Sequence, residues 1–185
     1  MATHIAIPQS LPKTGTTIRS WMMYSFNKHK ELLKLQLQNA PYSIHFSFDP
    51  WTSTNGLAII GIIGHWVSTE GVIKHGLLSM KKIEGAHSGD NQAALVMNML
   101  TEYDILNKIG YFTLDNASSN DSALRILAQD LKGLGISFNW KEKRLRCFGH
   151  IINLIVKALL YGANTNTIPI NDPDSSDLEL SPEEL

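Results

Sequence analysis

The sequence predicts an α/β fold in which helices flank a five-stranded mixed sheet. Three strand-like segments come first and helices and strands then alternate, which gives the order β-β-β-α-β-α-β-α after an amino-terminal helix. A helix between two strands carries the chain back across the sheet, so the later strands are expected to run parallel to an earlier one. With 185 residues, 43% of them hydrophobic, the chain can bury one ordinary core.

The two ends are expected to lie outside that core. Residues 1–16 show little pattern and are expected to be disordered. Residues 17–40 have helical spacing of apolar side chains and predict a helix packed on the body, with Trp21, Met22 and Met23 in its core or interface. The sheet domain is assigned to residues 41–162.

The last segment, residues 163–185, is predicted to be a disordered acidic tail. From Gly162 onward the chain has six acids and no Lys or Arg. Its composition shifts to Asn, Thr, Pro, Asp, Ser and Glu, which is typical of a linker or a solvated end.

The first three strands are read from alternation and turn signals. Ile44–Asp49 alternates apolar and polar residues, and Pro50 is expected to end the strand. Leu57–Val67 is apolar on both faces, as an interior strand would be. After the turn at Ser68–Gly71, Val72–Met80 is expected to return as its antiparallel partner.

The second half alternates helices and strands. Ser88 is expected to cap a crossover helix that leads into a strand ending on Asp115. Ser118 and Asp121 fit a capping box for the next helix. A short strand over Lys143–Phe148 and an apolar helix from about Gly149 to Tyr161 complete the pattern.

Asp49 and Asp115 are the candidate chemical residues. If the first and fourth strands are neighbours, both carboxylates meet at one end of the sheet, where open α/β sheets hold their ligands. Two converging carboxylates repel each other unless a cation lies between them, and oxygen ligands suit Mg²⁺ or Mn²⁺. Taken by itself, however, Asp115 is more often a turn or capping aspartate than a metal ligand.

The closing helix has one narrow polar stripe. His150, Asn153 and Lys157 lie at spacings that put them on one side of the helix. The single cysteine, Cys147, excludes an internal disulfide and a multi-cysteine zinc module within this sequence. From spacing alone, Cys147 and His150 fit a buried thiol and a helix-start imidazole, because two ligands without partners do not hold a structural zinc.

Composition limits the function classes only weakly. No apolar run is long enough to span a bilayer and no signal peptide is recognisable, which predicts a soluble intracellular protein. Residues 1–161 carry an excess of five positive charges, because all 16 basic residues and 11 of the 17 acids lie there. This excess permits a nucleic-acid partner without arguing for one.

Four segments together resemble the hAT superfamily of cut-and-paste DNA transposases, especially the fungal type: Phe48–Asn55, Ile83–Asn91, Gly110–Asp121 and Arg144–Leu154. The resemblance runs in order from about Ser20 to Gly162. It implies a ribonuclease H-like fold, a nuclear location, and a catalytic Asp-Asp-Glu triad that binds Mg²⁺ or Mn²⁺ and acts on transposon-end DNA.

By the same resemblance, Asp49 and Asp115 match the two catalytic aspartates. Cys147 and His150 match the family's Cys-x-x-His element, which is associated with DNA handling, and Asn153 and Lys157 extend the same helix edge. The family's helical insertion, its glutamate helix, its dimerisation region and its amino-terminal zinc finger have no match here. Glu179, Glu183 and Glu184 are therefore interpreted as a solvated acidic end.

Three hypotheses follow. The first is a fragment or relic of a metal-dependent transposase that is inactive alone, and it leaves open whether the metal is still bound. The second is a non-catalytic protein that binds DNA or a full-length transposase. The third is a stand-alone nuclease of the same fold.

Overall fold

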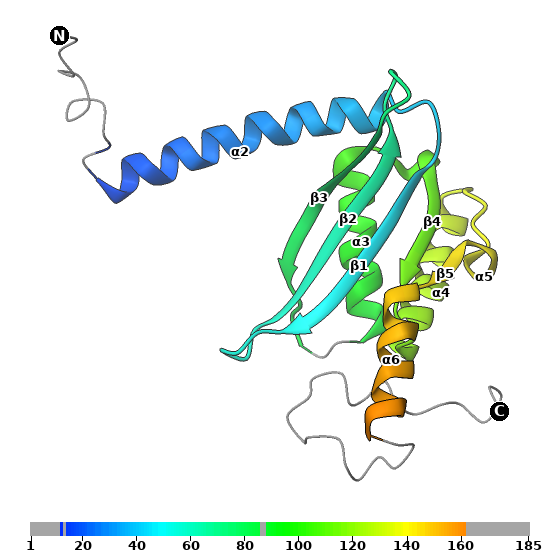
Figure 1. Cartoon of the computed structure of the whole chain (residues 1–185). Coiled ribbons are helices and arrows are strands. Elements are labelled where there is room, and N and C mark those ends of the chain that lie inside the picture. The colour runs from blue at the N-terminus through cyan, green and yellow to red at the C-terminus, as the bar shows by residue number, and fades with distance from the viewer. Residues whose placement is uncertain (1–11, 13, 86–87, 162–185) are drawn as a thin grey trace.

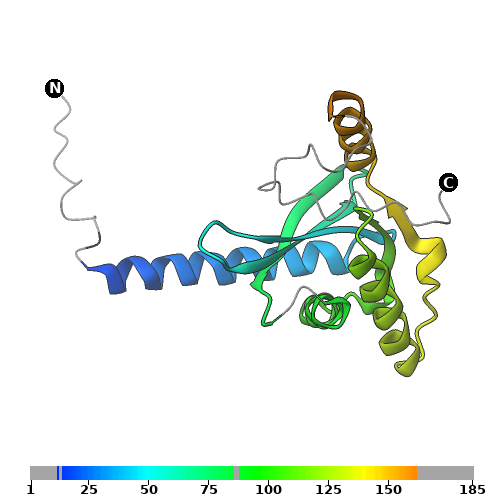
Figure 2. The same ribbon diagram turned by 90° about the horizontal axis from the view of Figure 1, so that it is seen from below.

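The predicted five-stranded sheet of the α/β fold is present, and helices pack against it. The computed structural model describes residue 12 and residues 14–85 and 88–161. Helices α3 and α4 cover one face of the sheet, and α6 lies near one end of the other face, whereas α2 projects away from the sheet (Figures 1 and 2). The elements are α2 (Gly15–Gln38), β1 (Ile44–Thr52), β2 (Ala58–Val67), β3 (Ile73–Lys82), α3 (Gly89–Tyr103), a 3₁₀ turn (Leu106–Lys108), β4 (Ile109–Leu114), α4 (Ser118–Gly133), α5 (Trp140–Lys143), β5 (Arg144–Arg146) and α6 (Phe148–Tyr161).

The strand order is β3-β2-β1-β4-β5. Strands β1, β2 and β3 are antiparallel neighbours, which confirms the predicted hairpin. Strand β4 lies beside β1 and runs parallel to it, and β5 runs parallel to β4. The first and fourth strands are therefore neighbours, the condition on which the convergence of Asp49 and Asp115 depends.

Alternation along β1 and β4 separates the core from the open face of the sheet. Phe46 and Phe112 are fully or almost fully buried on the side covered by α3 and α4, and their rings stack with centroids 5.2 Å apart. Burial of each such ring stabilises the fold by roughly 1.5–3 kcal/mol. Ser47 and Thr113 are paired across the same two strands, and as alternate residues they face the other side.

Strand β1 continues past Asp49, which corrects the prediction that Pro50 ends it. Pro50 pairs with Ile60, and the pairing with β2 extends to Thr52. The pairing between β1 and β4 ends earlier, at Ser47 and Thr113. Beyond that point β1 has a neighbour on one side only, so a proline without an N–H is tolerated there.

The start of α4 also differs from the prediction. Ala117 is the N-cap and makes no side-chain capping bond, so the capping box of Ser118 and Asp121 is not formed. Ser118 is instead the first residue of the helix. The backbone N–H of Ala117 donates to Asp115 Oδ1 over 3.1 Å, so Asp115 forms an Asx turn directly before the helix.

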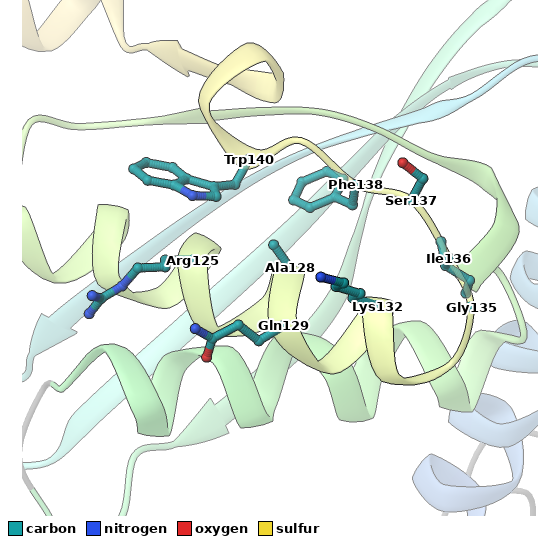
Figure 3. A pocket seen from close by; sticks show the side chains of 9 residues that line it. All are labelled: Arg125, Ala128, Gln129, Lys132, Gly135, Ile136, Ser137, Phe138 and Trp140. Carbon is teal, nitrogen blue, oxygen red and sulfur yellow. The ribbon is translucent and has the colours of Figure 1, made fainter.

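A cavity of about 530 Å³ lies between α4 and the segment that leads into α5. Trp140 and Phe138 are on one side, and Arg125, Gln129 and Lys132 of α4 are on the other (Figure 3). None of the predicted site residues lines this cavity.

Helix α2 forms as expected but packs differently. Leu37, near its carboxyl end, is fully buried. Trp21, Met22 and Met23 are 53%, 66% and 50% exposed, so the prediction that they belong to a core or interface within this chain is wrong. These residues lie in the amino-terminal part of the helix, which projects away from the sheet (Figure 1). Nothing in the described part of the chain covers them.

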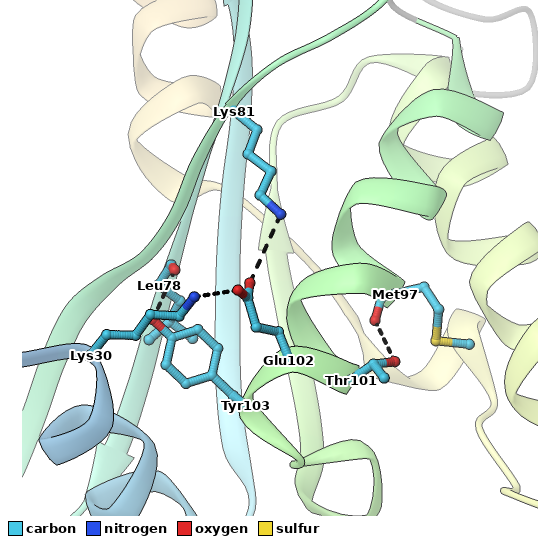
Figure 4. A network of polar contacts seen from close by, with 7 residues as sticks. All are labelled: Lys30, Leu78, Lys81, Met97, Thr101, Glu102 and Tyr103. Atoms are coloured by element: carbon cyan, nitrogen blue, oxygen red, sulfur yellow. Dashed lines mark hydrogen bonds and ion pairs between the residues drawn. The ribbon is translucent and has the colours of Figure 1, made fainter. Parts of the chain in front are cut away.

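Polar contacts hold the packed part of α2 against α3 and β3 (Figure 4). Lys30 pairs with Glu102, and Lys81 lies 3.8 Å from the other oxygen of the same carboxylate. Next to Glu102, the hydroxyl of Tyr103 donates to the carbonyl of Leu78 over 3.0 Å. The lysines lower the pKa of Glu102, chiefly through the hydrogen bond from Lys30.

Two sequence predictions concern mainly residues outside the described part of the chain. These are the disordered start at 1–16, where α2 already begins at Gly15, and the acidic tail at 163–185. None of the described helices is both long and apolar enough to span a membrane.

Candidate functional site

Five of the six side chains singled out from the sequence line one cavity of about 610 Å³ on the open face of the sheet: Asp49, Asp115, Cys147, His150 and Asn153. The sixth, Lys157, lies further along α6 and is not part of the lining. The cavity thus combines residues that are up to 104 positions apart in sequence, from Asp49 to Asn153.

The strand register explains why these residues converge. Ser47 and Thr113 form the last pair between β1 and β4, and Asp49 and Asp115 each follow two residues later in the chain. The two strands no longer pair at that point, but both aspartates line the same cavity. Both side chains lie on the open face, because alternate residues of a strand share a face.

Cys147 continues the same row on the other side of Asp115. Leu114 pairs with Arg146, so the next residue of each strand brings Asp115 opposite Cys147. The backbone N–H of Cys147 donates to the carbonyl of Leu114 over 2.7 Å, which extends the pairing by one residue. The carbonyl of Cys147 then accepts the N–H of Ile151 over 3.1 Å and begins α6.

Asp115 is held by one of its two carboxylate oxygens. Its Oδ1 accepts the N–H of Ala117 and the side-chain amide of Asn120, which is almost fully buried. Within the described residues, Oδ2 makes no such bond. The carboxylate is therefore fixed on the helix side and has one oxygen left for a ligand in the cavity.

Arg144 ties β5, β4 and α4 together behind the cavity. Its Nη2 donates to the carbonyl of Asp115 over 2.5 Å, and its Nε pairs with Asp121 of α4. The side chain is 9% exposed, whereas that of Asp121 is 46% exposed. Arg144 thus holds the backbone of Asp115 without entering the cavity lining.

The β2 side of the cavity is kept open by a glycine. Gly61 pairs with Asp49 across β1 and β2, and a Cβ at Gly61 would lie 3.3 Å from the ring of Trp51. The ring of Trp51 therefore lies close over β2 beside Asp49. On the far side, His150 and Asn153 of α6 complete the lining.

Sequence reasoning missed the supporting residues. Arg144 and Asn120 act through tertiary contacts, and no local pattern singles out an arginine that reaches back 29 positions to a carbonyl. Ser47 and Thr113 line the cavity beside the aspartates. The two-residue period before each aspartate is a signal that could have placed them there.

The donor set suits a hard divalent cation in part. Two carboxylates in one cavity, with hydroxyl and amide oxygens nearby, are the ligands that Mg²⁺ and Mn²⁺ prefer. Among the described residues, no group of three or more His, Cys, Asp or Glu side chains could hold a metal ion. Two carboxylates are fewer ligands than such an ion takes, so an ion at this site would need further oxygen ligands from water or substrate.

Comparison with known proteins agrees with this architecture. The family described as the ZBED1 RNase-like domain matches residues 47–139, about half of the chain. This range includes Asp49 and Asp115 and ends before Cys147.

Three curated relatives illustrate the range of similar proteins. A Zea mays protein named as an AC transposase is 24% identical over 147 residues, which cover 78% of this chain and 18% of the relative. A Talaromyces stipitatus protein named as the transcriptional regulator tpeD is 27% identical, covering 78% and 17%. The zinc finger BED domain-containing protein RICESLEEPER 1 of Oryza sativa subsp. japonica is 21% identical, covering 76% and 20%. The chain thus spans about a fifth of the length of the relatives it matches.

Proposed function

Because the chain belongs to the ZBED1 RNase-like domain family and is a hAT-type transposase-like protein, we propose that its cavity is part of a metal-dependent site for cleaving DNA phosphodiester bonds. The observation that carries the proposal is that one cavity is lined by Asp49 of β1, by Asp115 directly after β4 and by Cys147 directly after β5. A folded domain with no such chemistry has no need to gather two carboxylates on an open face, since like charges repel there.

In this proposal Asp49 and Asp115 hold Mg²⁺ or Mn²⁺. The ion would supply Lewis-acid activation of a phosphodiester and stabilise a leaving oxygen. Asp115 offers Oδ2, because Oδ1 is engaged by Ala117 and Asn120. Arg144 is a positioning residue that fixes the backbone of Asp115.

The helix edge of α6 has a separate role in the proposal. His150 and Asn153 line the cavity opposite the aspartates and are placed to bind or orient a DNA phosphate. Lys157 lies two turns beyond His150, where it would contact DNA outside the cavity. The partner in this proposal is DNA, and the location that goes with it is the nucleus.

Direct metal binding tests the proposal. Titration of Mn²⁺ into the full chain, followed by electron paramagnetic resonance, is expected to show one site that Asp49→Asn or Asp115→Asn weakens by roughly tenfold or more. Asp130→Asn is the matched control, because this aspartate is exposed on α4 and lies outside the cavity. Equal Mn²⁺ affinity in the wild type and both site variants would show that the two carboxylates share no ion.

Nicking of supercoiled plasmid in Mg²⁺ or Mn²⁺ provides the second measurement. Among the described residues only two acids line the cavity, so slow nicking is expected, or nicking only together with a full-length transposase. Nicking by the purified chain that survives both substitutions would refute the catalytic assignment.

A second function is favoured by one comparison. The relative tpeD is named as a transcriptional regulator, so one relative of this chain has a name that indicates regulation and not transposition. We propose as the alternative a non-catalytic protein that binds DNA or a full-length transposase. DNA binding that persists in an Asp49→Asn/Asp115→Asn double variant, without metal binding or nicking by the wild type, would select this alternative.

A further inference from the structure

Five side chains cross the open face of the sheet in one line, next to residues that line the acid cavity. His75, His65 and His45 are paired in sequence across β3, β2 and β1. Tyr111 of β4 stacks on His45 with ring centroids 5.5 Å apart, and the Lys143 ammonium lies 4.5 Å from the centroid of Tyr111. We call this set the donor row.

Backbone geometry builds His45 into the row. The register between β1 and β4 shifts between Ile44 and Phe46, and the N–H of Tyr111 donates to His45 Nδ1 over 3.0 Å. A Cβ at Gly110 would lie 2.6 Å from that nitrogen, so only glycine leaves room for the ring. Because Nδ1 accepts a hydrogen bond, His45 carries its proton on Nε2.

The other histidines are also oriented by neighbours. His65 Nε2 lies 3.4 Å from the hydroxyl oxygen of Ser47, and the rings of His65 and His75 have centroids 6.1 Å apart. Burial lowers the pKa of His65, and His75 and His45 lower it further. All three histidines are exposed, and Tyr111 is 38% exposed.

Charge and position indicate what the row would bind. Rings that stack on each other expose their edges to solvent. The exposed groups of the row are therefore imidazole N–H and phenol O–H donors, together with the ammonium of the lysine. Neither the donor row nor the next row toward the cavity contains a carboxylate; that second row consists of Leu77, Ile63, Ser47, Thr113 and Leu145. The acids follow only in the third row, four residues beyond His45 and Tyr111, or about 13 Å along the strands.

We propose that the donor row binds the phosphodiester backbone of the DNA strand whose scissile bond lies at Asp49 and Asp115. This inference rests on the proposed function, because it takes the cavity as the cleavage site. A row of donors that contains no carboxylate complements a polyanion, and the shared open face connects it to the cavity without an intervening element in the described chain.

Fluorescence anisotropy in EDTA tests the row apart from metal binding. The probes are a labelled single strand and the same strand annealed to its complement. A His65→Ala/His75→Ala double variant is expected to bind at least one of them about tenfold more weakly, since hydrogen bonds to charged phosphates are the strong ones. His29→Ala, which removes an exposed histidine of α2, is the matched control.

The lysine gives a second readout. Lys143→Ala is expected to reduce the slope of log K against log salt by about 0.7–0.9, the value of one phosphate contact. Lys132→Ala, on α4 beside the cavity of Figure 3, is expected to leave the slope unchanged. The melting temperature of each variant separates loss of binding from loss of fold.

Wild-type protein keeps the proposal testable if the double variant unfolds. On addition of DNA, the imidazole NMR signals of His65 and His75 are expected to shift, whereas that of His29 does not. Unchanged signals, or a folded double variant that binds both probes within about twofold of the wild type, would overturn the donor row. Wild-type protein that binds DNA but no Mn²⁺ would instead refute the metal site and leave the row standing.

Discussion

The link between Arg144 and Asp115 makes the support of the candidate site measurable. Arg144→Met keeps most of the aliphatic stem and removes the guanidinium. Its hydrogen bond to the Asp115 carbonyl is charge-assisted and contributes about 1.5–3 kcal/mol. The pair with Asp121 adds only about 0.2–1 kcal/mol, because that carboxylate is 46% exposed and regains water.

One feature of Arg144 reduces the stabilisation expected from its two contacts. Its Nη1 is buried and has no hydrogen-bond partner in the described structure, which costs about 1 kcal/mol or more. We therefore expect Arg144→Met to lower the free energy of unfolding by about 2 kcal/mol, or the melting temperature by roughly 4–8 °C.

Urea unfolding followed by circular dichroism measures this difference. Arg125→Met is the control, because Arg125 is exposed on α4 and should change stability by less than about 0.5 kcal/mol. If Arg144→Met also stays within about 0.5 kcal/mol of the wild type, the arginine does not hold β4, β5 and α4 together. In that case weakened Mn²⁺ binding could not be attributed to its positioning of Asp115.

Three further substitutions test the packing and the anchor of α2. Gly89→Ala would place a Cβ 2.6 Å from the Cβ of Ser122 and is expected to destabilise the α3–α4 contact by about 1–3 kcal/mol in thermal unfolding. Tyr103→Phe leaves a β3 carbonyl without its hydroxyl donor and should cost about 1–2 kcal/mol in urea unfolding, whereas a neutral result would mean that water replaces the hydroxyl. Because the pKa of Glu102 is lowered by Lys30, its ionised form stabilises the fold above pH 4.5, and this contribution is lost as the pH falls below that value. Glu102→Gln should thus be less stable than the wild type by about 0.2–1 kcal/mol at pH 7 and equal to it at low pH, and a gap that persists in acid would assign the effect to packing.

The sequence by itself determined the order of the elements and the faces of the strands. A period of two along residues 44–49 and 111–115 shows which side chains share a face, because successive residues of a strand point in opposite directions. The hairpin of β2 and β3 also follows from local turn chemistry. Hence Asp49 and Asp115 could be named as candidate partners on the condition that the first and fourth strands are neighbours.

Only the tertiary structure decided how that edge of the sheet is built. Whether Pro50 ends β1 depends on where β4 stops beside it, and the cap of α4 depends on the position of Asp115. The donor row and the arginine behind Asp115 join residues that lie far apart in the chain. Local periodicity contains no information on such contacts, because strand order and register are set by packing across the whole sheet.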